Sequence, residues 1–499
     1  MGFERDYYAV LGIAVGADEK TIKRAYRNLA RRYHPDVSRQ ADSPERFREI
    51  QEAYDLLLDA KQRTAYDLWR RQQGLDQAPP LALRVTPSQE SLPCIGEPQM
   101  LYLLVEILAS EEIQSCRLPI NLCLVLDRST SMKGGRLQQV KEAARYIVDQ
   151  LQPEDVLSLV VFDDRADLVL PGQPGIDRGT ARSAINHIQT GGGTEILQGL
   201  KLGWEQVRRW QGADNLSHLI LLTDGQTYGD DEGCLEMARL AAREHVSLTL
   251  MGVGADWNDK LLDQMADLAE SPGGSVYIDT PDKIVKAFHE RIQNLGSIYA
   301  QEVTLSLHVN DGATLKDAFR VSPQIGRLTF VDERAKLGVL EKGRTQAFIL
   351  ELLVDSGSPG EHRLAQIDVE GIVPAMDRRP VRCHFTLTVA FDMYLNRVSS
   401  VPPDIASAVG KLTVFKMQER AMADIEVGHI EPAVSRLKTL STRLLDIGET
   451  ELARAALLEA GRLEQTGSLS PAGRKKIRFG TRDLGILPKE VRYDQVPDL

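Results

Sequence analysis

A short apolar stretch of the sequence ends in a group of oxygen-bearing side chains. Residues 121–126 read NLCLVL, Asp127 follows them, and hydroxyl groups come at Ser129 and Ser131. A buried strand that ends in a carboxylate and alternating hydroxyls would bring three oxygen ligands into one loop. Hard cations such as Mg²⁺ prefer oxygen ligands in octahedral geometry. The stretch therefore predicts an ion site at the carboxyl edge of a sheet.

The segment around this stretch, residues 118–296, alternates between strand-like and helix-like patterns. Strands are expected over 120–126, 156–162, 166–170, 218–223, 246–252 and 275–278. Helices are expected over 136–151, 179–188, 195–210, 232–243, 258–269 and 281–295. Such alternation predicts a doubly wound parallel sheet with helices on both faces. Ligands of such sheets bind at the carboxyl ends of the strands.

Two further oxygen donors stand where that rule expects them. Thr194 follows the glycines 191–193 and begins a helix, and Asp224 ends the apolar run 219–222. Two carboxylates balance the charge of a divalent ion, and the hydroxyls add no charge. The ion would remain electrophilic at an open position, which a carboxylate of a partner protein can fill. We find no nucleophile–base set here, so the pattern indicates binding rather than hydrolysis.

The same residues are compatible with other roles. The pattern D-x-S-x-S can cap a helix, and the GGGT loop can cradle a phosphate, although G-K-[ST] is absent. Neither alternative explains Asp224. Asp163, Asp164 and Glu195 flank the area and could accept hydrogen bonds around the ligands. For Asp163 and Asp164, a solvated-loop role is the preferred expectation.

The constellation DRSTS (127–131), GGGTE (191–195) and LLTDG (221–225) resembles the metal-ion-dependent adhesion site of von Willebrand factor A (vWA) domains. The resemblance implies that Ser129, Ser131 and, depending on state, Thr194 coordinate the ion directly. It implies that Asp127 and Asp224 act mostly through metal-bound water. Mg²⁺ is the expected ion, with Mn²⁺ and Ca²⁺ as alternatives.

The N-terminal residues 1–72 read as a small helical module. Ile22, Tyr26, Leu29 and Tyr33 form an apolar stripe, and Lys20, Arg24, Arg27 and Arg31 form a basic stripe on the opposite face. Pro35 disfavours helical geometry at His34, and a second helix is expected to begin at Ser43-Pro44. These features predict an antiparallel helical hairpin whose tip is His34-Pro35-Asp36.

This module resembles a DnaJ-type J-domain. The resemblance is carried by DYYAVLGI (6–13), the basic helix, HPD (34–36) and AYDLLLDAKQRTAYD (53–67). It implies that His34, Pro35 and Asp36, together with the basic face, bind a DnaK-type heat-shock ATPase and stimulate its ATP hydrolysis. The Gly/Phe-rich linker and the Cys-rich zinc repeats of full DnaJ proteins are missing.

The remaining segments complete a multidomain architecture. Residues 73–80 are expected to be a linker, and residues 81–117 plus 297–395 to form an antiparallel β-sandwich into which the α/β domain is inserted. Its strands are expected at 81–87, 100–110, 302–309, 327–331, 345–354, 362–373 and 381–391. Residues 400–466 predict a helical hairpin or bundle. Residues 467–499 read as a polar tail, which either docks on a domain or is presented to a partner.

Composition bounds the function. The 499-residue chain carries a formal net charge of −11, which argues against nucleic-acid binding. Its five cysteines are scattered and form no C-x-x-C pair, which is typical of a reducing compartment. No secretory signal stands at residues 1–10, and no apolar run approaches the roughly 20 residues that span a bilayer. We expect a cytoplasmic protein with no membrane span.

Together the two motifs predict a non-enzymatic co-chaperone or scaffold. The vWA domain would bind a protein ligand through an acidic side chain, and the J-domain would bring a DnaK-type chaperone to it. The alternative is a vWA subunit of a remodelling or metal-insertion assembly driven by an AAA+ ATPase.

Overall fold

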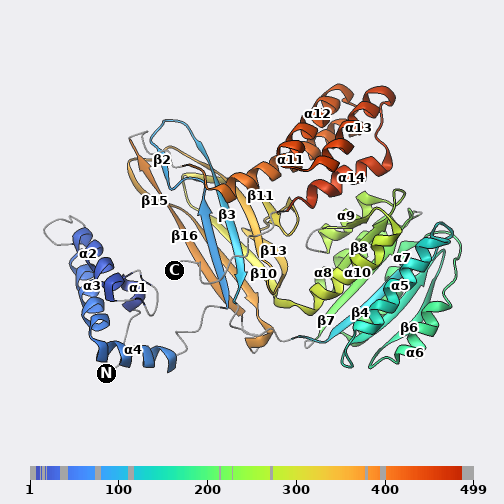
Figure 1. The fold of residues 1–499 in the computed structure, drawn as a ribbon, viewed down its shortest axis with the longest axis horizontal. Coiled ribbons are helices and arrows are strands. Elements are labelled where there is room, and N and C mark those ends of the chain that lie inside the picture. The colour runs from blue at the N-terminus through green and yellow to red at the C-terminus, as the bar shows by residue number, and fades with distance from the viewer. Residues whose placement is uncertain are drawn as a thin grey trace. The chain divides into compact units, whose positions relative to one another are not determined.

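The computed structural model describes residues 7–11, 13, 17, 19–33, 43–72, 80–110, 117–212, 215–227, 229–269, 274–376, 380–393 and 400–485. The chain divides into two compact units (Figure 1). The first is built mainly from Met1–Ala82, and the second from Leu83–Ala109 and Ile113–Pro488.

The first unit is helical. Its helices are α1 (Tyr7–Leu11), α2 (Glu19–Tyr33), α3 (Ser43–Leu58) and α4 (Ala60–Gln72). The predicted pairing of α2 with α3 is present, because Ile22 is fully buried and the rings of Tyr26 and Tyr54 stack with their centroids 4.0 Å apart. Helix α4 is fixed to α1 by Tyr66, whose hydroxyl accepts a hydrogen bond from the Tyr7 backbone at 3.0 Å.

The middle of the second unit is the predicted α/β domain. Its sheet has the strand order β6-β5-β4-β7-β8-β9. The strands are β4 (Ile120–Asp127), β5 (Val156–Phe162), β6 (Ala166–Pro174), β7 (Leu216–Thr223), β8 (Ser247–Val253) and β9 (Val276–Ile278). The helices are α5 (Gly135–Gln150), α6 (Arg178–Asn186), α7 (Ile196–Trp210), α8 (Asp231–Arg243), α9 (Asp259–Leu268) and α10 (Ile284–Gly296). One face packs on α5, α6 and α10, and the other on α7, α8 and α9.

The sheet differs from the prediction at one edge. Strand β6 runs antiparallel to β5, whereas β4, β5, β7, β8 and β9 pair in parallel. The physical reason is the length of the connection. Only residues 163–165 separate β5 from β6, which is enough for a hairpin and too short for a crossover helix.

Strands from both sides of the α/β domain form two five-stranded sheets, ordered β1-β3-β14-β11-β12 and β13-β10-β15-β16-β2. The strands before the domain are β1 (Leu81–Pro87), β2 (Ser91–Pro93) and β3 (Gln99–Ala109). Those after it are β10 (Ile298–Val309), β11 (Ala313–Ser322), β12 (Gly326–Arg327), β13 (Arg334–Glu341), β14 (Gln346–Val354), β15 (Gly360–Ile372) and β16 (Pro380–Asp392). Because β3 pairs with β14 and β2 with β16, both flanks of the insertion share these sheets.

Three of these strands were missed in the sequence, and one was misplaced. Strands β2, β11 and β13 were not predicted, and the strand expected at 327–331 is only the two-residue β12. Strands β11 and β13 carry charged residues among their apolar ones, and their register is set by β14 and β10. Pairing with these neighbouring strands, rather than the local sequence pattern, therefore explains why β11 and β13 are extended.

Four helices follow the sheets: α11 (Pro403–Glu426), α12 (Ile430–Asp446), α13 (Thr450–Thr466) and α14 (Pro471–Arg482). They share a core with the β-sheet, where Phe319 and Ile349 pack among buried residues of α11 such as Leu412. The expectation of a polar tail from residue 467 is wrong over α14. Ser470 caps this helix by accepting a hydrogen bond from Gly473, and a proline occupies its first turn.

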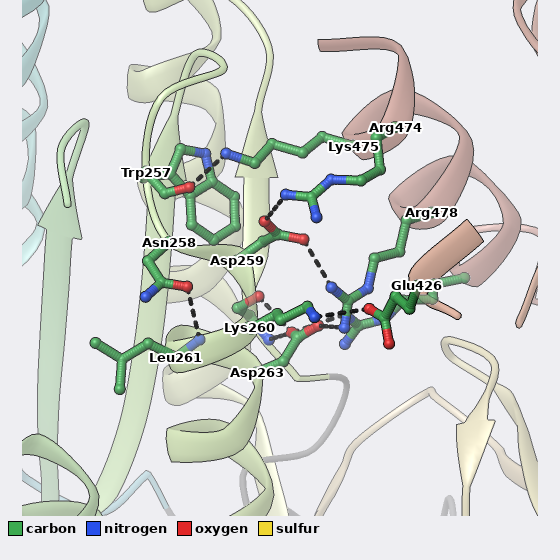
Figure 2. A network of polar contacts seen from close by, with 12 residues as sticks. Trp257, Asn258, Asp259, Lys260, Leu261, Asp263, Glu426, Arg474, Lys475 and Arg478 are labelled. Atoms are coloured by element: carbon green, nitrogen blue, oxygen red, sulfur yellow. Dashed lines mark hydrogen bonds and ion pairs between the residues drawn. The ribbon is translucent and has the colours of Figure 1, made fainter. Parts of the chain in front are cut away.

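Helix α14 binds the α/β domain through a network of polar contacts (Figure 2). Arg474 and Arg478 donate to the Asp259 carboxylate of α9 at 2.6 and 2.7 Å. Lys475 is 1% exposed, and its ammonium donates to the carbonyls of Ala255 and Trp257, both at 2.6 Å. The basic residues of α14 therefore form contacts within the fold. Of the two alternatives expected for the tail, docking on a domain is the one found for this part of it.

Candidate metal-binding site

Strand β4 delivers Asp127 to the carboxyl edge of the α/β sheet. Every residue of β4 is buried, as expected of a central parallel strand covered on both faces. One carboxylate oxygen, Oδ1, accepts a hydrogen bond from the Ser129 backbone at 2.7 Å, and Oδ2 accepts one from the Thr223 hydroxyl at 2.6 Å. Burial raises the pKa of Asp127 to about 6, because the charged form has lost its water.

The two serines and Asp224 meet Asp127 at this edge. The hydroxyl of Ser129 lies 2.9 Å from that of Ser131, which in turn donates to Asp224 Oδ1 at 2.6 Å. A short 3₁₀ turn, Thr130–Met132, gives the serines this arrangement, and the fully buried Met132 anchors it in the core. Asp127 and Asp224 are fully or almost fully buried, whereas Ser131 is exposed. The site therefore opens to solvent at Ser131, whereas the hydroxyl-bearing residues Ser129 and Thr194 are buried.

The glycine loop brings in Thr194. Thr130 binds this loop through its backbone N–H, which donates to the Gly192 carbonyl at 3.0 Å, and through its hydroxyl, which lies 2.8 Å from the Gly191 carbonyl and 3.0 Å from that of Gly192. A Cβ on Gly225 would lie 3.0 Å from Thr194 Oγ1, so the Thr194 hydroxyl sits directly against the residue that follows Asp224. All five predicted ligand residues therefore gather at one edge of the sheet.

Asp163 corrects one expectation. Its carboxylate is 3% exposed and accepts a hydrogen bond from Arg128 Nε at 2.9 Å, so it is not a solvated loop residue. A Cβ on Gly191 would lie only 1.6 Å from Asp163 Oδ2, which explains the glycine at that position. Asp164 is exposed, as expected. The Asp163–Arg128 pair fixes the loop that carries the serines.

Two residues of the site were missed in the sequence. Thr223 binds Asp127, and a hydroxyl at the end of an apolar strand was the available signal. Arg136, in the first turn of α5, forms an ion pair with Asp224 Oδ2 and lies 3.4 Å from the Ser131 carbonyl through Nη1. No local pattern marks this arginine, because 88 positions separate it from its partner.

These donors fit a hard divalent cation. Two buried carboxylates face hydroxyl groups, and the group contains no soft ligand. Within the described ranges, no cluster of three or more His, Cys, Asp or Glu side chains is placed to hold a metal. The set of candidate metal ligands therefore depends on the hydroxyl groups as much as on the carboxylates.

The chaperone-binding residues predicted in the first unit are described in part. Lys20, Arg24 and Arg27 are exposed on α2, on the face opposite the buried Ile22. The side chain of Arg31 and all of His34, Pro35 and Asp36 lie outside the described residues.

Comparisons with known proteins match three segments of the chain. Residues 6–67 match the DnaJ domain family, residues 121–289 the von Willebrand factor type A domain family, and residues 403–486 the Sll0103-like, C-terminal alpha-helical domain family. The chain therefore carries a DnaJ-type J-domain and a vWA domain, followed by a helical region similar to the Sll0103-like one.

Individual relatives agree with these assignments. An uncharacterized protein of Synechocystis sp., sll0103, is 29% identical over 383 residues, covering 75% of this chain and 90% of that protein. The chaperone protein DnaJ of Brevibacillus choshinensis is 54% identical over 69 residues, covering 14% of this chain and 18% of that protein. A solved von Willebrand factor type A structure from Catenulispora acidiphila superimposes with a TM-score of 0.65 at 16% identity, over 83% of this chain and 98% of that one.

A J-domain and a vWA domain in one chain support a DnaJ-like co-chaperone or scaffold role. Among the helices of the described part of the chain, none has the length and apolar character needed to traverse a bilayer.

Proposed function

We propose that the chain is a non-enzymatic, cytoplasmic co-chaperone or scaffold with two binding sites. Its vWA domain binds a protein partner through a carboxylate of that partner, bridged by a divalent cation. Its J-domain recruits a DnaK-type chaperone and stimulates ATP hydrolysis by it. The observation that carries the proposal is the gathering of Asp127, Ser129, Ser131, Thr194 and Asp224 at one solvent-facing edge, in a chain that also has a J-domain.

The charge of the vWA site favours binding of an acidic group. Asp127 and Asp224 neutralise a divalent ion, while the hydroxyls of Ser129 and Ser131 are neutral ligands. A bound cation would supply an electrophilic position to a carboxylate from outside. The residues of the chain would hold that cation, and its open position would lie on the exposed Ser131 side.

The J-domain half rests on the helical hairpin and on its exposed cations. Lys20, Arg24 and Arg27 lie on one face of α2 and are free of the packing that buries Ile22. An exposed basic face favours association with an acidic partner surface and accelerates encounter.

A cytoplasmic location is supported by the thiols of Cys94, Cys123, Cys234 and Cys383, which are free rather than paired in disulfides.

The metal half is tested by titrating the full chain with Mg²⁺ in a calorimeter. Ser129→Ala and Ser131→Ala remove one ligand hydroxyl each and leave the buried carboxylates in place. We expect each to weaken Mg²⁺ binding at least about tenfold, as losses of single coordination partners do. Ser183→Ala, an exposed serine on α6, is the matched control. Unchanged Mg²⁺ binding in both site variants would refute the metal site.

The chaperone half is tested by the steady-state ATPase rate of a DnaK-type chaperone. Wild-type chain should stimulate the rate, and His34→Gln should abolish the stimulation. His187→Gln changes an exposed histidine of the vWA domain and should stimulate as wild type does. Full stimulation by His34→Gln, or none by the wild type, would contradict this half.

Partner binding is tested by affinity capture with and without a chelator, followed by mass spectrometry. A partner of the vWA site should be captured by the wild type in Mg²⁺, lost in excess chelator and lost with Ser129→Ala. Capture that survives both changes would not involve the site. Mn²⁺ and Ca²⁺ in place of Mg²⁺ identify the ion that supports capture best.

A further inference from the structure

Arg136 occupies a position that helix electrostatics alone disfavours. It lies in the first turn of α5, where the helix dipole favours anions and disfavours cations. That turn contains no acidic residue to compensate. The partner that holds the guanidinium comes instead from the metal site, because Asp224 Oδ2 accepts from Arg136 Nη1. The side chain of Arg136 is therefore held by a residue of the metal site and not by the dipole or the acidic residues of its own helix.

The guanidinium is only partly used by the protein. Among the described residues, its hydrogen bonds to Asp224 and to the Ser131 carbonyl both come from Nη1. Nη2 lies against Gly254, where a Cβ would stand 3.3 Å away, so the missing side chain leaves room for it. The side chain of Arg136 is 32% exposed, whereas that of Asp224 is fully buried. An arginine carries five N–H donors in a planar fork, so donors remain for a ligand that reaches the exposed part of the side chain.

These contacts place a fixed positive charge at the open side of the site. The fork of an arginine matches a carboxylate, which can accept two parallel hydrogen bonds from it. The same charge opposes a divalent cation nearby, since like charges repel. Arg136 thus has opposite expected effects on the two ligands of the site: it weakens the binding of the cation and strengthens the binding of the carboxylate.

We propose that Arg136 is the specificity-determining residue of the vWA site, and that it donates to the partner's carboxylate beside the bridging cation. This inference rests on the proposed function of the site and deepens it by naming a second contact for the acidic partner. It predicts that the site discriminates carboxylates from neutral oxygen ligands more strongly than the cation would by itself.

Two variants separate this role from a structural one. Arg136→Gln keeps an N–H donor for Asp224 and removes the charge, and Arg136→Lys keeps the charge and removes the fork. The first probe is Mg²⁺ alone, titrated into the full chain in a calorimeter. The second is acetate, added to the Mn²⁺-loaded chain and followed by water-proton relaxation, which falls when acetate displaces metal-bound water.

We expect Arg136→Gln to bind Mg²⁺ at least as tightly as the wild type and acetate at least about tenfold more weakly, as for a lost hydrogen bond to a charged group. Arg136→Lys should retain part of the acetate affinity. Unchanged acetate affinity in Arg136→Gln would overturn the inference. So would weakening of Mg²⁺ and acetate together, because loss of site structure would explain both. If the wild type binds no Mg²⁺, or if Ser129→Ala and Ser131→Ala both bind it normally, the proposed function itself fails, a result distinct from either of these.

Discussion

The contact between α14 and α9 should contribute measurably to stability, and Asp259→Asn tests it. Asp259 is 1% exposed and accepts hydrogen bonds from Arg474 and Arg478 at 2.6 and 2.7 Å (Figure 2). Asparagine keeps the volume and removes the charge. Because the two arginine side chains remain 37% and 28% exposed, the cost of breaking this pair lies at the low end for buried pairs. With about 1.5 kcal/mol for each charged hydrogen bond, the expected loss is about 3 kcal/mol.

The assay is urea unfolding of the full chain, followed by tryptophan fluorescence. Trp257 reports on the contact, because its ring centroid lies 5.6 Å from that of Phe479 and 4.4 Å from the Lys475 ammonium. The transition that involves Trp257 should move to lower urea concentration. The change should also make the segment around α14 easier to cleave by protease, since the helix is released before the rest unfolds.

The matched control removes a carboxylate from an exposed ion pair. Glu464 lies 3.0 Å from Lys438, and their side chains are 59% and 49% exposed. Glu464→Gln should cost about 0.5 kcal/mol or less, because exposed pairs are screened by solvent. If Asp259→Asn costs no more than this control, the α14 contact is not the stabilising clamp that its geometry indicates.

Three further predictions concern close packing and titration. Gly252→Ala should lower the melting temperature, with a cost of at least about 2 kcal/mol, because the new Cβ would lie 2.0 Å from the Trp257 ring; unchanged melting contradicts this. Gly225→Ala should weaken Mg²⁺ binding measured by calorimetry, because its Cβ would lie 3.0 Å from Thr194 Oγ1 and force that hydroxyl to shift; unaltered binding would contradict the expectation that the position of this hydroxyl limits Mg²⁺ affinity. Burial lowers the pKa of Lys475 from 10.5 to about 8, so between these pH values the unfolded chain keeps a proton that the folded chain has released. The stability of the wild type relative to Lys475→Met should therefore rise with pH across that window, and a constant difference in urea unfolding would count against the shift.

The α/β domain was largely predictable because its signals are local. A predominantly apolar run such as residues 121–126 indicates a strand covered on both faces, and the helices between the strands show their own apolar stripes. The rule that ligands bind at carboxyl ends of parallel strands then brought Asp127, Thr194 and Asp224 to one edge. The same reasoning failed for β11 and β13, since their charged residues obscure the alternation and their partners lie far along the chain.

The contacts of the C-terminal segment, in contrast, could not be predicted from its local sequence. The basic run RKKIR at 474–478 falls in the predicted polar tail, because lysine and arginine are mostly exposed, and the sequence left open whether this tail docks on a domain or is presented to a partner. In the fold, Asp259 supplies the counter-charge and the carbonyls of Ala255 and Trp257 accept the Lys475 ammonium. Those acceptors are more than 200 positions away in sequence, as the separations of 215, 218 and 220 show.

The types of domain and of ligand were predictable from local patterns, because helix periodicity, strand ends and the HPD and D-x-S-x-S patterns are properties of neighbouring residues. The tertiary structure instead sets how the metal site is supported. It brings Thr223 to Asp127, Arg136 to Asp224 and Arg128 to Asp163, with separations of 96, 88 and 35 residues. Such pairings depend on strand order and on the crossing of connections, and no local pattern encodes them. They nevertheless set the burial of Asp127 and the positive charge beside Asp224, on which the chemistry of the site depends.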